Sequence, residues 1–271
     1  MDIINLSFTN KRFETHQITI GKLQMGGTNP IRIQSMANTP THDVAASVAQ
    51  AIEIFDAGAE LVRFTVVDVK DAYALNDIKQ QLVAKGYTQP IVADVHFNPN
   101  LADIAAQYVD KVRINPGNYL EKRATFTKLE FTDEEYQTEL EKLDNRLLKL
   151  LNICKEHGTA LRIGTNHGSL SDRIMSRYGD TPAGMVEATM EFLRICQKYD
   201  FQDVAVSLKS SNTVVMVQAY RLLAKQMTAE QMNFPVHLGV TEAGTGEEGV
   251  IKSAVGIGTL LTDGIGDTIR V

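Results

Sequence analysis

The sequence contains only two cysteines, Cys154 and Cys196, and they lie far apart in the chain. Each is surrounded by apolar residues in a segment that we expect to be helical, so both are predicted to be buried, reduced thiols. No Cys-x-x-Cys or His-x-His pattern occurs, and such spacings are typical of metal sites. We therefore expect no metal site in this chain.

Long apolar runs are also missing. None reaches the ~18 residues of a membrane span, and residues 1–5 have neither the basic start nor the apolar core of a secretion signal. The net charge of −6 and the pI near 5.6 argue against nucleic acid as the main partner. These absences favour a cytoplasmic protein with neither a nucleic-acid nor a membrane partner.

What is present is a regular alternation of short Val/Ile-rich strands and amphipathic helices along 271 residues. We expect strands at 31–36, 61–66, 91–96, 112–115, 160–165, 204–209, 236–240 and 268–271. We expect helices at 43–56, 69–84, 101–108, 133–156, 182–199, 213–227 and 247–261. This alternation predicts an α/β fold, a closed (β/α)8 barrel of the TIM type. Because the chain stops on the last predicted strand, we expect the barrel to lack its eighth helix.

Two segments stand outside this alternation. Residues 17–24 predict a short hairpin, so we expect residues 1–30 to form an N-terminal arm and residues 31–271 to form the barrel domain. The polar segment 120–133 has no clear periodicity and is longer than a usual strand-to-helix loop. We interpret it as either functional or an embellishment.

Basic and amide side chains recur at the C-terminal ends of the predicted strands. Arg113 and Asn115 are two residues apart, so they share one face of their strand. Arg162 and Asn166 repeat this arrangement. With the Ser207 hydroxyl, these side chains form a strand-end set of Arg63, Arg113, Asn115, Arg162, Asn166, Ser207, Lys209 and Arg270. Other polar residues near the same strand ends are Gln34, Ser35, Thr65, Asp94, His96, Thr241 and Glu242.

The C-terminal ends of the strands carry the active site in this fold, so the cations of this set should meet at one mouth. Like charges that are brought together repel each other unless an anion lies between them. Guanidinium groups match the oxygens of phosphate, and the Lys209 ammonium adds a point charge. The sequence therefore predicts that the mouth binds a small, highly charged phosphate ester.

Three other features of the mouth have two interpretations each. His96, two residues after Asp94, is either a donor or acid at the site or a core histidine. Glu242 is either an acid or base or the partner of one of the cations. The Gly-rich loop 242–249 enters a predicted helix, where it either contacts phosphate or carries glutamates that only offset the helix dipole. His237, at the start of its strand, is expected to be a core residue.

One set of motifs covers nearly the whole chain: Ile31–Met36, Val92–Phe97, Val112–Asn118, Leu161–Ser169, His237–Gly244 and Gly264–Val271. As a set they resemble the 4-hydroxy-3-methylbut-2-enyl diphosphate synthase family of the non-mevalonate isoprenoid pathway. The segment Asn118–Tyr136 resembles that of the longer form of this family, which has an extra middle domain.

The resemblance implies a substrate, 2-C-methyl-D-erythritol 2,4-cyclodiphosphate. The family opens its ring and removes a hydroxyl reductively, with two electrons that pass through a [4Fe-4S] cluster from a donor such as ferredoxin or flavodoxin. The resemblance also implies that the strand-end set listed above binds the diphosphate and the polyol. It implies catalytic roles for His96 and Glu242, with Glu242 as the candidate proton handler.

The family's cluster ligands, three cysteines and a glutamate, lie in a C-terminal domain, and Cys154 and Cys196 match none of them. We therefore expect this chain to be the isolated N-terminal barrel of an iron-sulfur oxidoreductase, which binds the substrate without turning it over. An uncovered barrel strand favours pairing with another chain, so we expect that two copies can associate as a homodimer.

Two other functions remain open at this point. A pterin-binding barrel of the dihydropteroate synthase type shares the predicted architecture and would need a carboxylate such as Asp94 to bond the pterin ring. A non-catalytic phosphate-binding scaffold would share the cationic mouth.

Overall fold

The structure, a computed structural model, describes residues 12–120 and 130–271. Eight parallel strands form its wall: β3 (Arg32–Met36), β4 (Leu61–Val66), β5 (Ile91–Val95), β6 (Lys111–Ile114), β7 (Ala160–Asn166), β8 (Val204–Lys209), β9 (His237–Leu238) and β10 (Thr268–Ile269). Neighbouring strands are hydrogen-bonded in the order β8-β7-β6-β5-β4-β3-β10-β9. A parallel bridge between Val206 and Val236 joins the two ends of this sheet. The closed barrel that the sequence predicts is confirmed.

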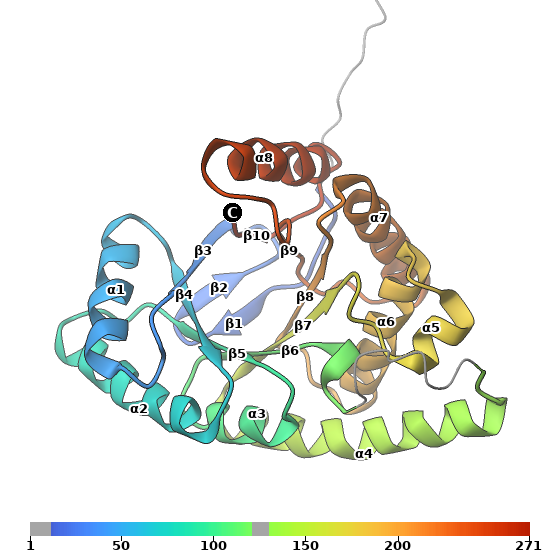
Figure 1. The fold of residues 1–271 in the computed structure, drawn as a ribbon, viewed down its shortest axis with the longest axis horizontal. Helices are drawn as coiled ribbons and strands as arrows, with labels where there is room; N and C mark the ends of the chain where they lie inside the picture. The colour runs from blue at the N-terminus through green and yellow to red at the C-terminus, as the bar shows by residue number, and fades with distance from the viewer. Residues whose placement is uncertain (1–11, 121–129) are drawn as a thin grey trace, which may run out of the picture.

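The helices form a ring outside the strands (Figure 1). They are α1 (Val44–Asp56), α2 (Val69–Ala84), α3 (Pro99–Ala105), α4 (Asp133–His157), α5 (Asp172–Tyr178), α6 (Pro182–Lys198), α7 (Thr213–Ala229) and α8 (Gly246–Thr262). The short helix α5, between β7 and α6, is not among the predicted elements. In the described parts of the chain, no helix follows β10. None of the helices in these parts has the length and apolar character that a membrane span requires.

The longest helix, α4, illustrates how the sequence fixes the outer layer. Its N-terminus is a capping box between Thr132 and Glu135, and Gly158 ends it in the left-handed conformation that favours glycine. Leucines at helical spacing, such as Leu143, Leu147 and Leu150, are buried toward the barrel. The polar segment before α4 was predicted to be irregular, but its residues 121–129 lie outside the described residues.

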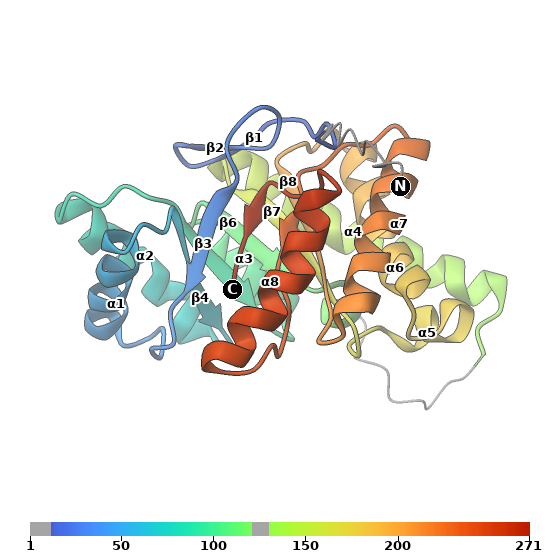
Figure 2. The same cartoon turned by 90° about the horizontal axis from the view of Figure 1, so that it is seen from above.

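The predicted hairpin is present as β1 (Ile18–Ile20) and β2 (Leu23–Met25), which pair antiparallel. It lies across the end of the barrel where the strands begin (Figure 2). Ile18, Ile20 and Met25 are buried against Leu61 and Val92 near the starts of β4 and β5. The hairpin therefore closes the end of the barrel where the strands begin, and the opposite end is available as a mouth. The first part of the predicted arm, residues 1–11, is outside the described range.

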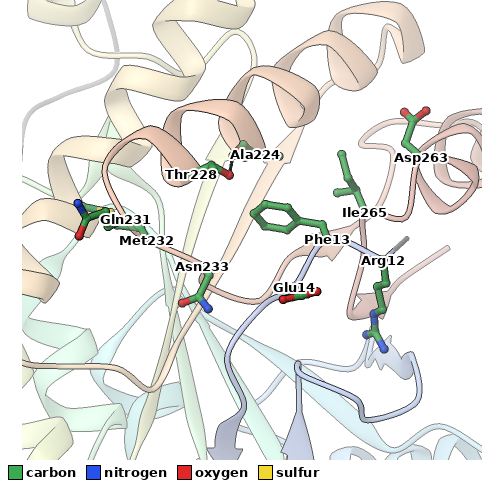
Figure 3. Close-up of a pocket in the computed structure, with 10 residues that line it drawn as sticks. All are labelled: Arg12, Phe13, Glu14, Ala224, Thr228, Gln231, Met232, Asn233, Asp263 and Ile265. Atoms are coloured by element: carbon green, nitrogen blue, oxygen red, sulfur yellow. Dashed lines mark hydrogen bonds between the residues drawn. The ribbon is translucent and has the colours of Figure 1, made fainter. Parts of the chain in front are cut away.

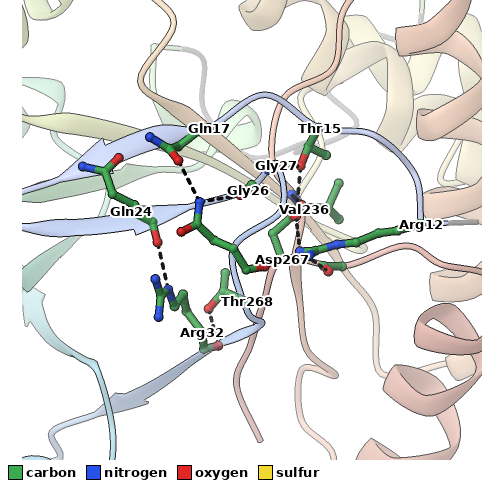
Figure 4. Close-up of polar contacts among 12 residues, drawn as sticks. Arg12, Thr15, Gln17, Gln24, Gly26, Gly27, Arg32, Val236, Asp267 and Thr268 are labelled. Atoms are coloured by element: carbon green, nitrogen blue, oxygen red, sulfur yellow. Dashed lines mark hydrogen bonds and ion pairs between the residues drawn. The ribbon is translucent and has the colours of Figure 1, made fainter.

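A buried carboxylate connects the segment before the hairpin to the barrel. Asp267 accepts hydrogen bonds from Val236 N (2.7 Å), Thr15 Oγ1 (3.0 Å) and Arg12 Nη2 (2.7 Å) (Figure 4). Burial raises the pKa of this carboxyl group even though each of these donors favours its ionised form. The contacts join the segment before the hairpin to β9 and β10, which are both very short.

We expect the substitution Asp267→Ala to lower the free energy of unfolding by about 2–4 kcal/mol, because it leaves buried donors without an acceptor. Denaturant unfolding of the purified chain measures this loss. The control is Asp263→Ala, which removes an exposed ion pair with Arg221 and should cost no more than about 1 kcal/mol. Equal losses for the two variants would contradict the role of Asp267.

Candidate functional site

A polar cavity of about 620 Å³ opens at the C-terminal end of the barrel strands. Eight of the predicted site residues line it: Arg63, His96, Arg113, Arg162, Asn166, Lys209, Glu242 and Arg270. They come from β4, β6, β7 and β8 and from the turns that follow β5, β9 and β10. The parallel strands thus bring together side chains that are separated by up to about 200 positions in the sequence.

Two predicted residues, Asn115 and Ser207, do not line this cavity. Asn115 follows β6 and caps the 3-10 turn η1 (Pro116–Asn118), where its Oδ1 accepts from Gly117 N at 3.2 Å. Its Nδ2 donates to Ser169 Oγ at 3.1 Å. These contacts give Asn115 a structural role in the turn. Ser207 is buried in β8, opposite Gly164 of β7.

Asp94 is the centre of the polar network in this cavity. Its Oδ1 accepts a hydrogen bond of 2.8 Å from Arg113 Nη1, and its Oδ2 lies 3.3 Å from Arg63 Nε and 3.5 Å from His96 Nε2. Burial alone would raise the pKa of Asp94, but Arg113 and Arg63 outweigh it and hold this pKa well below its ordinary value. The carboxylate is therefore ionised and neutralises only part of the cationic charge.

The strand geometry fixes the direction of Arg113. Its Nη2 donates to the carbonyl oxygen of Gly164 at 2.8 Å. A Cβ atom at position 164 would lie 2.5 Å from Arg113 Nε, so only glycine leaves room for the guanidinium group. The glycine in the Arg-Ile-Gly sequence of β7 therefore leaves space for Arg113 of the neighbouring strand.

Several nitrogen atoms of the cavity have no hydrogen-bond partner among the described residues. They are Lys209 Nζ and the Nε atoms of Arg63, Arg113 and Arg162, of which Arg63 Nε has only its ion-pair contact with Asp94. All four side chains are almost fully buried. Buried donors without acceptors are costly, so the arrangement would be completed by an anion with several oxygen atoms.

Burial and mutual repulsion lower the pKa values of Lys209 and Arg63. Burial, followed by repulsion from Arg162, Arg63 and Arg270, places the pKa of Lys209 well below its ordinary value. Burial is also the main reason that the pKa of Arg63 falls to about 10. The charged forms are therefore disfavoured until an anion is bound.

Glu242 and His96 lie at the rim of the cavity. Glu242 is exposed and has positive φ (51°), in the loop between β9 and α8. It forms no ion pair with a cavity cation in the parts of the chain that the structure describes. His96 is partly exposed beside Asp94. Both positions can reach a ligand from the solvent side.

Two charged residues received no role in the phosphate site from the sequence. Asp94 was noted on the same strand face as His96 and was considered only as a carboxylate for a pterin ring. Lys111 is two residues before Arg113, also points into the barrel, and donates to Gln34 Oε1 at 3.2 Å. It lies at the start of β6 and does not line the cavity.

A second cavity, of about 630 Å³, lies at the opposite end of the barrel, next to residues 12–14 and the end of α7 (Figure 3). Its charged lining residues are Arg12, Glu14 and Asp263. The Arg12 guanidinium binds Asp267 (Figure 4). No group of cations converges there in the described chain, so we place the candidate site at the barrel mouth.

The cysteines do not fit an iron-sulfur cluster. Cys154 on α4 and Cys196 on α6 are both buried and free. Burial raises the pKa of Cys154 to about 12 and also raises that of Cys196, whereas cluster ligation requires thiolates. Within residues 12–120 and 130–271, no group of three or more His, Cys, Asp or Glu side chains could hold a metal ion.

Comparison with known proteins gives a consistent match. The family model described as "GcpE TIM-barrel domain" matches residues 15–271. A 4-hydroxy-3-methylbut-2-en-1-yl diphosphate synthase (flavodoxin) of Parabacteroides distasonis is 63% identical over 97% of this chain. A chloroplastic 4-hydroxy-3-methylbut-2-en-1-yl diphosphate synthase (ferredoxin) of Oryza sativa is 52% identical over 97% of this chain. The chain spans 43% and 36% of the length of these two relatives.

Solved structures share the architecture at low identity. Dihydropteroate synthase of Xanthomonas albilineans superposes with a TM-score of 0.60 at 13% identity, over 95% of this chain and 92% of that protein. This likeness shows a common barrel fold and gives no support to a pterin-binding function.

Proposed function

Because the chain belongs to the GcpE TIM-barrel domain family, we propose that its cationic mouth binds 2-C-methyl-D-erythritol 2,4-cyclodiphosphate. The bound diphosphate would be converted reductively to 4-hydroxy-3-methylbut-2-enyl diphosphate by the complete enzyme. The names of the relatives and the charge of the cavity support the same class of ligand, a small organic diphosphate.

The observation that carries this proposal is the excess of buried cations over carboxylates. Among the described residues that line the cavity, Asp94 is the only buried carboxylate, whereas Arg63, Arg113, Arg162 and Lys209 are buried cations. A cyclic diphosphate carries one ionised oxygen on each phosphorus atom. Such a ligand would supply the missing negative charge and acceptors for the unpartnered nitrogens. The cavity volume also lies within the range that is usual for small-molecule sites.

The side chains divide into four roles under this proposal. The guanidinium groups and Lys209 hold the two phosphates, and Asn166 at the rim bonds a hydroxyl of the polyol. Asp94 orients Arg63 and Arg113 toward the ligand. His96 and Glu242 are the candidates for proton transfer because they approach the cavity from its open side. The roles first predicted for Asn115 and Ser207 would be indirect, through the turn and the strand that support the cavity.

Electron transfer is not assigned to residues of this chain. The family's [4Fe-4S] cluster would supply two electrons, but neither Cys154 nor Cys196 is suited to bind it. The relatives are named for flavodoxin and for ferredoxin, and we propose a donor of this kind for the complete enzyme. The part played by this barrel is to bind and orient the cyclodiphosphate.

Calorimetric titration of the chain with the cyclodiphosphate tests this function. We expect 1:1 binding that weakens with added salt, and Arg113→Ala and Arg162→Ala should each weaken it by about 1–3 kcal/mol. The matched control is Arg221→Ala, which removes an exposed arginine outside the cavity and should leave the affinity unchanged. No binding to the folded wild-type chain, or equal loss for Arg221→Ala, would reject the proposed site.

The affinity should also depend on pH in a defined direction. The pKa of Lys209 is low in the free protein and a bound dianion would raise it, so binding takes up protons. The affinity should therefore rise as the pH falls from the pKa of Lys209 in the complex toward its lower pKa in the free protein, by at most about tenfold per pH unit for each proton taken up. The ligand does not contribute, since each phosphorus has one ester link, one anhydride link and a single, strongly acidic oxygen. Titrations in buffers of different ionisation enthalpy measure the protons directly, and zero uptake would contradict this expectation.

A further inference from the structure

A buried histidine lies below the cationic mouth and contacts one of its arginines. His237 of β9 is fully buried, and its Nε2 lies 3.3 Å from Arg162 Nη1. A guanidinium group can only donate hydrogen bonds, so Nε2 must be the acceptor. The imidazole is then neutral and carries its proton on Nδ1.

Arg162 has fewer polar partners in the described chain than Arg113 or Arg63 has. Arg113 is held by Asp94 and by the Gly164 carbonyl, and Arg63 lies beside Asp94. Among the described residues, the His237 ring is the only side chain that forms a hydrogen bond with Arg162. The Nε atom of Arg162 is buried without a partner.

The surroundings keep the imidazole neutral. Burial is the main cause that lowers the pKa of His237 well below its ordinary value, and the neighbouring cations add to it. These cations come from four strands: Arg162 of β7, Lys209 of β8, Lys111 of β6 and Arg63 of β4. An imidazolium at this position would also lose the acceptor that faces Arg162.

A neutral acceptor has a specific advantage here. A carboxylate in the same place would also hold Arg162, but it would neutralise the guanidinium and compete with an anionic ligand. An imidazole fixes the direction of the guanidinium and leaves its charge available. The position of His237 is itself fixed, because Tyr220 Oη donates to the His237 carbonyl oxygen at 2.6 Å.

We propose that His237 is a positioning residue that holds Arg162 toward the ligand cavity through a neutral Nε2 acceptor. This inference rests on the proposed function, since it is the diphosphate that Arg162 would meet. His237 does not line the cavity itself, so its effect on binding would pass entirely through Arg162.

The test combines a spectroscopic and a binding measurement. Long-range ¹H–¹⁵N correlation spectra of the wild-type chain, assigned with His237→Gln, should show a neutral imidazole with the proton on Nδ1 from about pH 6 to about pH 8. In calorimetric titrations with the cyclodiphosphate, His237→Leu should weaken binding about tenfold or more. His237→Gln keeps an acceptor near the same place and should stay within about threefold of the wild type.

Asp103→Asn is the control for a purely structural effect. It weakens a buried ion pair with Arg146 outside the cavity and should lower stability without changing the affinity. A proton on Nε2, wild-type affinity in His237→Leu, or equal losses in the Leu and Gln variants would overturn the inference. If the wild-type chain does not bind, the proposed function falls and the positioning role falls with it. If only Arg113→Ala and Arg162→Ala weaken binding, the function stands and the role of His237 is rejected.

Discussion

The substitution Asp94→Asn is expected to lower the free energy of unfolding by about 3–5 kcal/mol, the cost of removing one partner from a buried ion pair. Asp94 is almost fully buried and lies within 3.3 Å of both Arg63 and Arg113. Asparagine has nearly the same size, so the change removes charge and leaves packing almost intact. The remaining cations would then repel one another without compensation.

This loss should be recovered in part by an added polyanion. We expect saturating pyrophosphate to stabilise Asp94→Asn more than it stabilises the wild type, because the variant has a larger excess of positive charge. Denaturant unfolding with and without pyrophosphate measures the stability that Asp94→Asn loses and the part that pyrophosphate restores. Asp103→Asn is the control, since Asp103 is a buried partner of Arg146 outside the cavity. Pyrophosphate should stabilise Asp103→Asn no more than it stabilises the wild type.

The same carboxylate predicts how stability depends on pH. The pKa of Asp94 in the folded protein is below its ordinary value of 3.8, so the unfolded chain binds the proton more tightly. Asp94 therefore stabilises the fold fully above this ordinary value, and this contribution is lost as the pH falls toward the lower folded pKa. The wild type should lose more stability than Asp94→Asn in this acidic range. If the wild type and Asp94→Asn lost the same stability between neutral and acidic pH, this would contradict the central place of Asp94.

Lys209→Met is expected to change stability and binding in opposite directions. The Lys209 ammonium is buried with no hydrogen-bond partner in the described chain, so replacing it with an apolar side chain of similar length should stabilise the free protein by about 1–3 kcal/mol. The same change removes a charge-assisted contact to the ligand and should weaken cyclodiphosphate binding by about 10- to 100-fold. Such opposite effects are typical of a site whose strain serves function.

Chemical denaturation and calorimetry of one protein preparation measure both effects. Lys111→Met is the matched control, because Lys111 is equally buried but does not line the cavity. It should weaken binding by less than about threefold. A less stable Lys209→Met variant with normal affinity would show that Lys209 supports the fold and not the ligand.

The barrel was predictable because each of its strands and helices is marked by a pattern within a short stretch of sequence. Short apolar strands and amphipathic helices alternate at nearly constant spacing, and parallel strands at that spacing close in only a few ways. The observed bounds of α2 coincide with those predicted, since Asp68 caps the start of this helix and Gly86 follows its end. Helix α3 was placed two residues too late, because the cap at Asn98 and the first-turn Pro99 were overlooked.

The site was predictable in outline and not in detail. The strand period placed Arg63, Arg113 and Arg162 at one mouth, and the structure brings them together. The central place of Asp94 depends on which inward side chains meet across neighbouring strands, which the sequence pattern alone does not determine. Asn115 looked like a ligand for the same reason as Arg113, but turn capping competes for its side chain.

The most direct test of the cationic mouth is a crystal structure of this chain with the cyclodiphosphate bound. We expect phosphate oxygens within hydrogen-bonding distance of Arg113 and Lys209, with Asp94 still bound to Arg113. We also expect Arg162 to reach the ligand while its Nη1 stays on His237. Well-defined ligand density elsewhere on the barrel, with an empty mouth, would contradict the account.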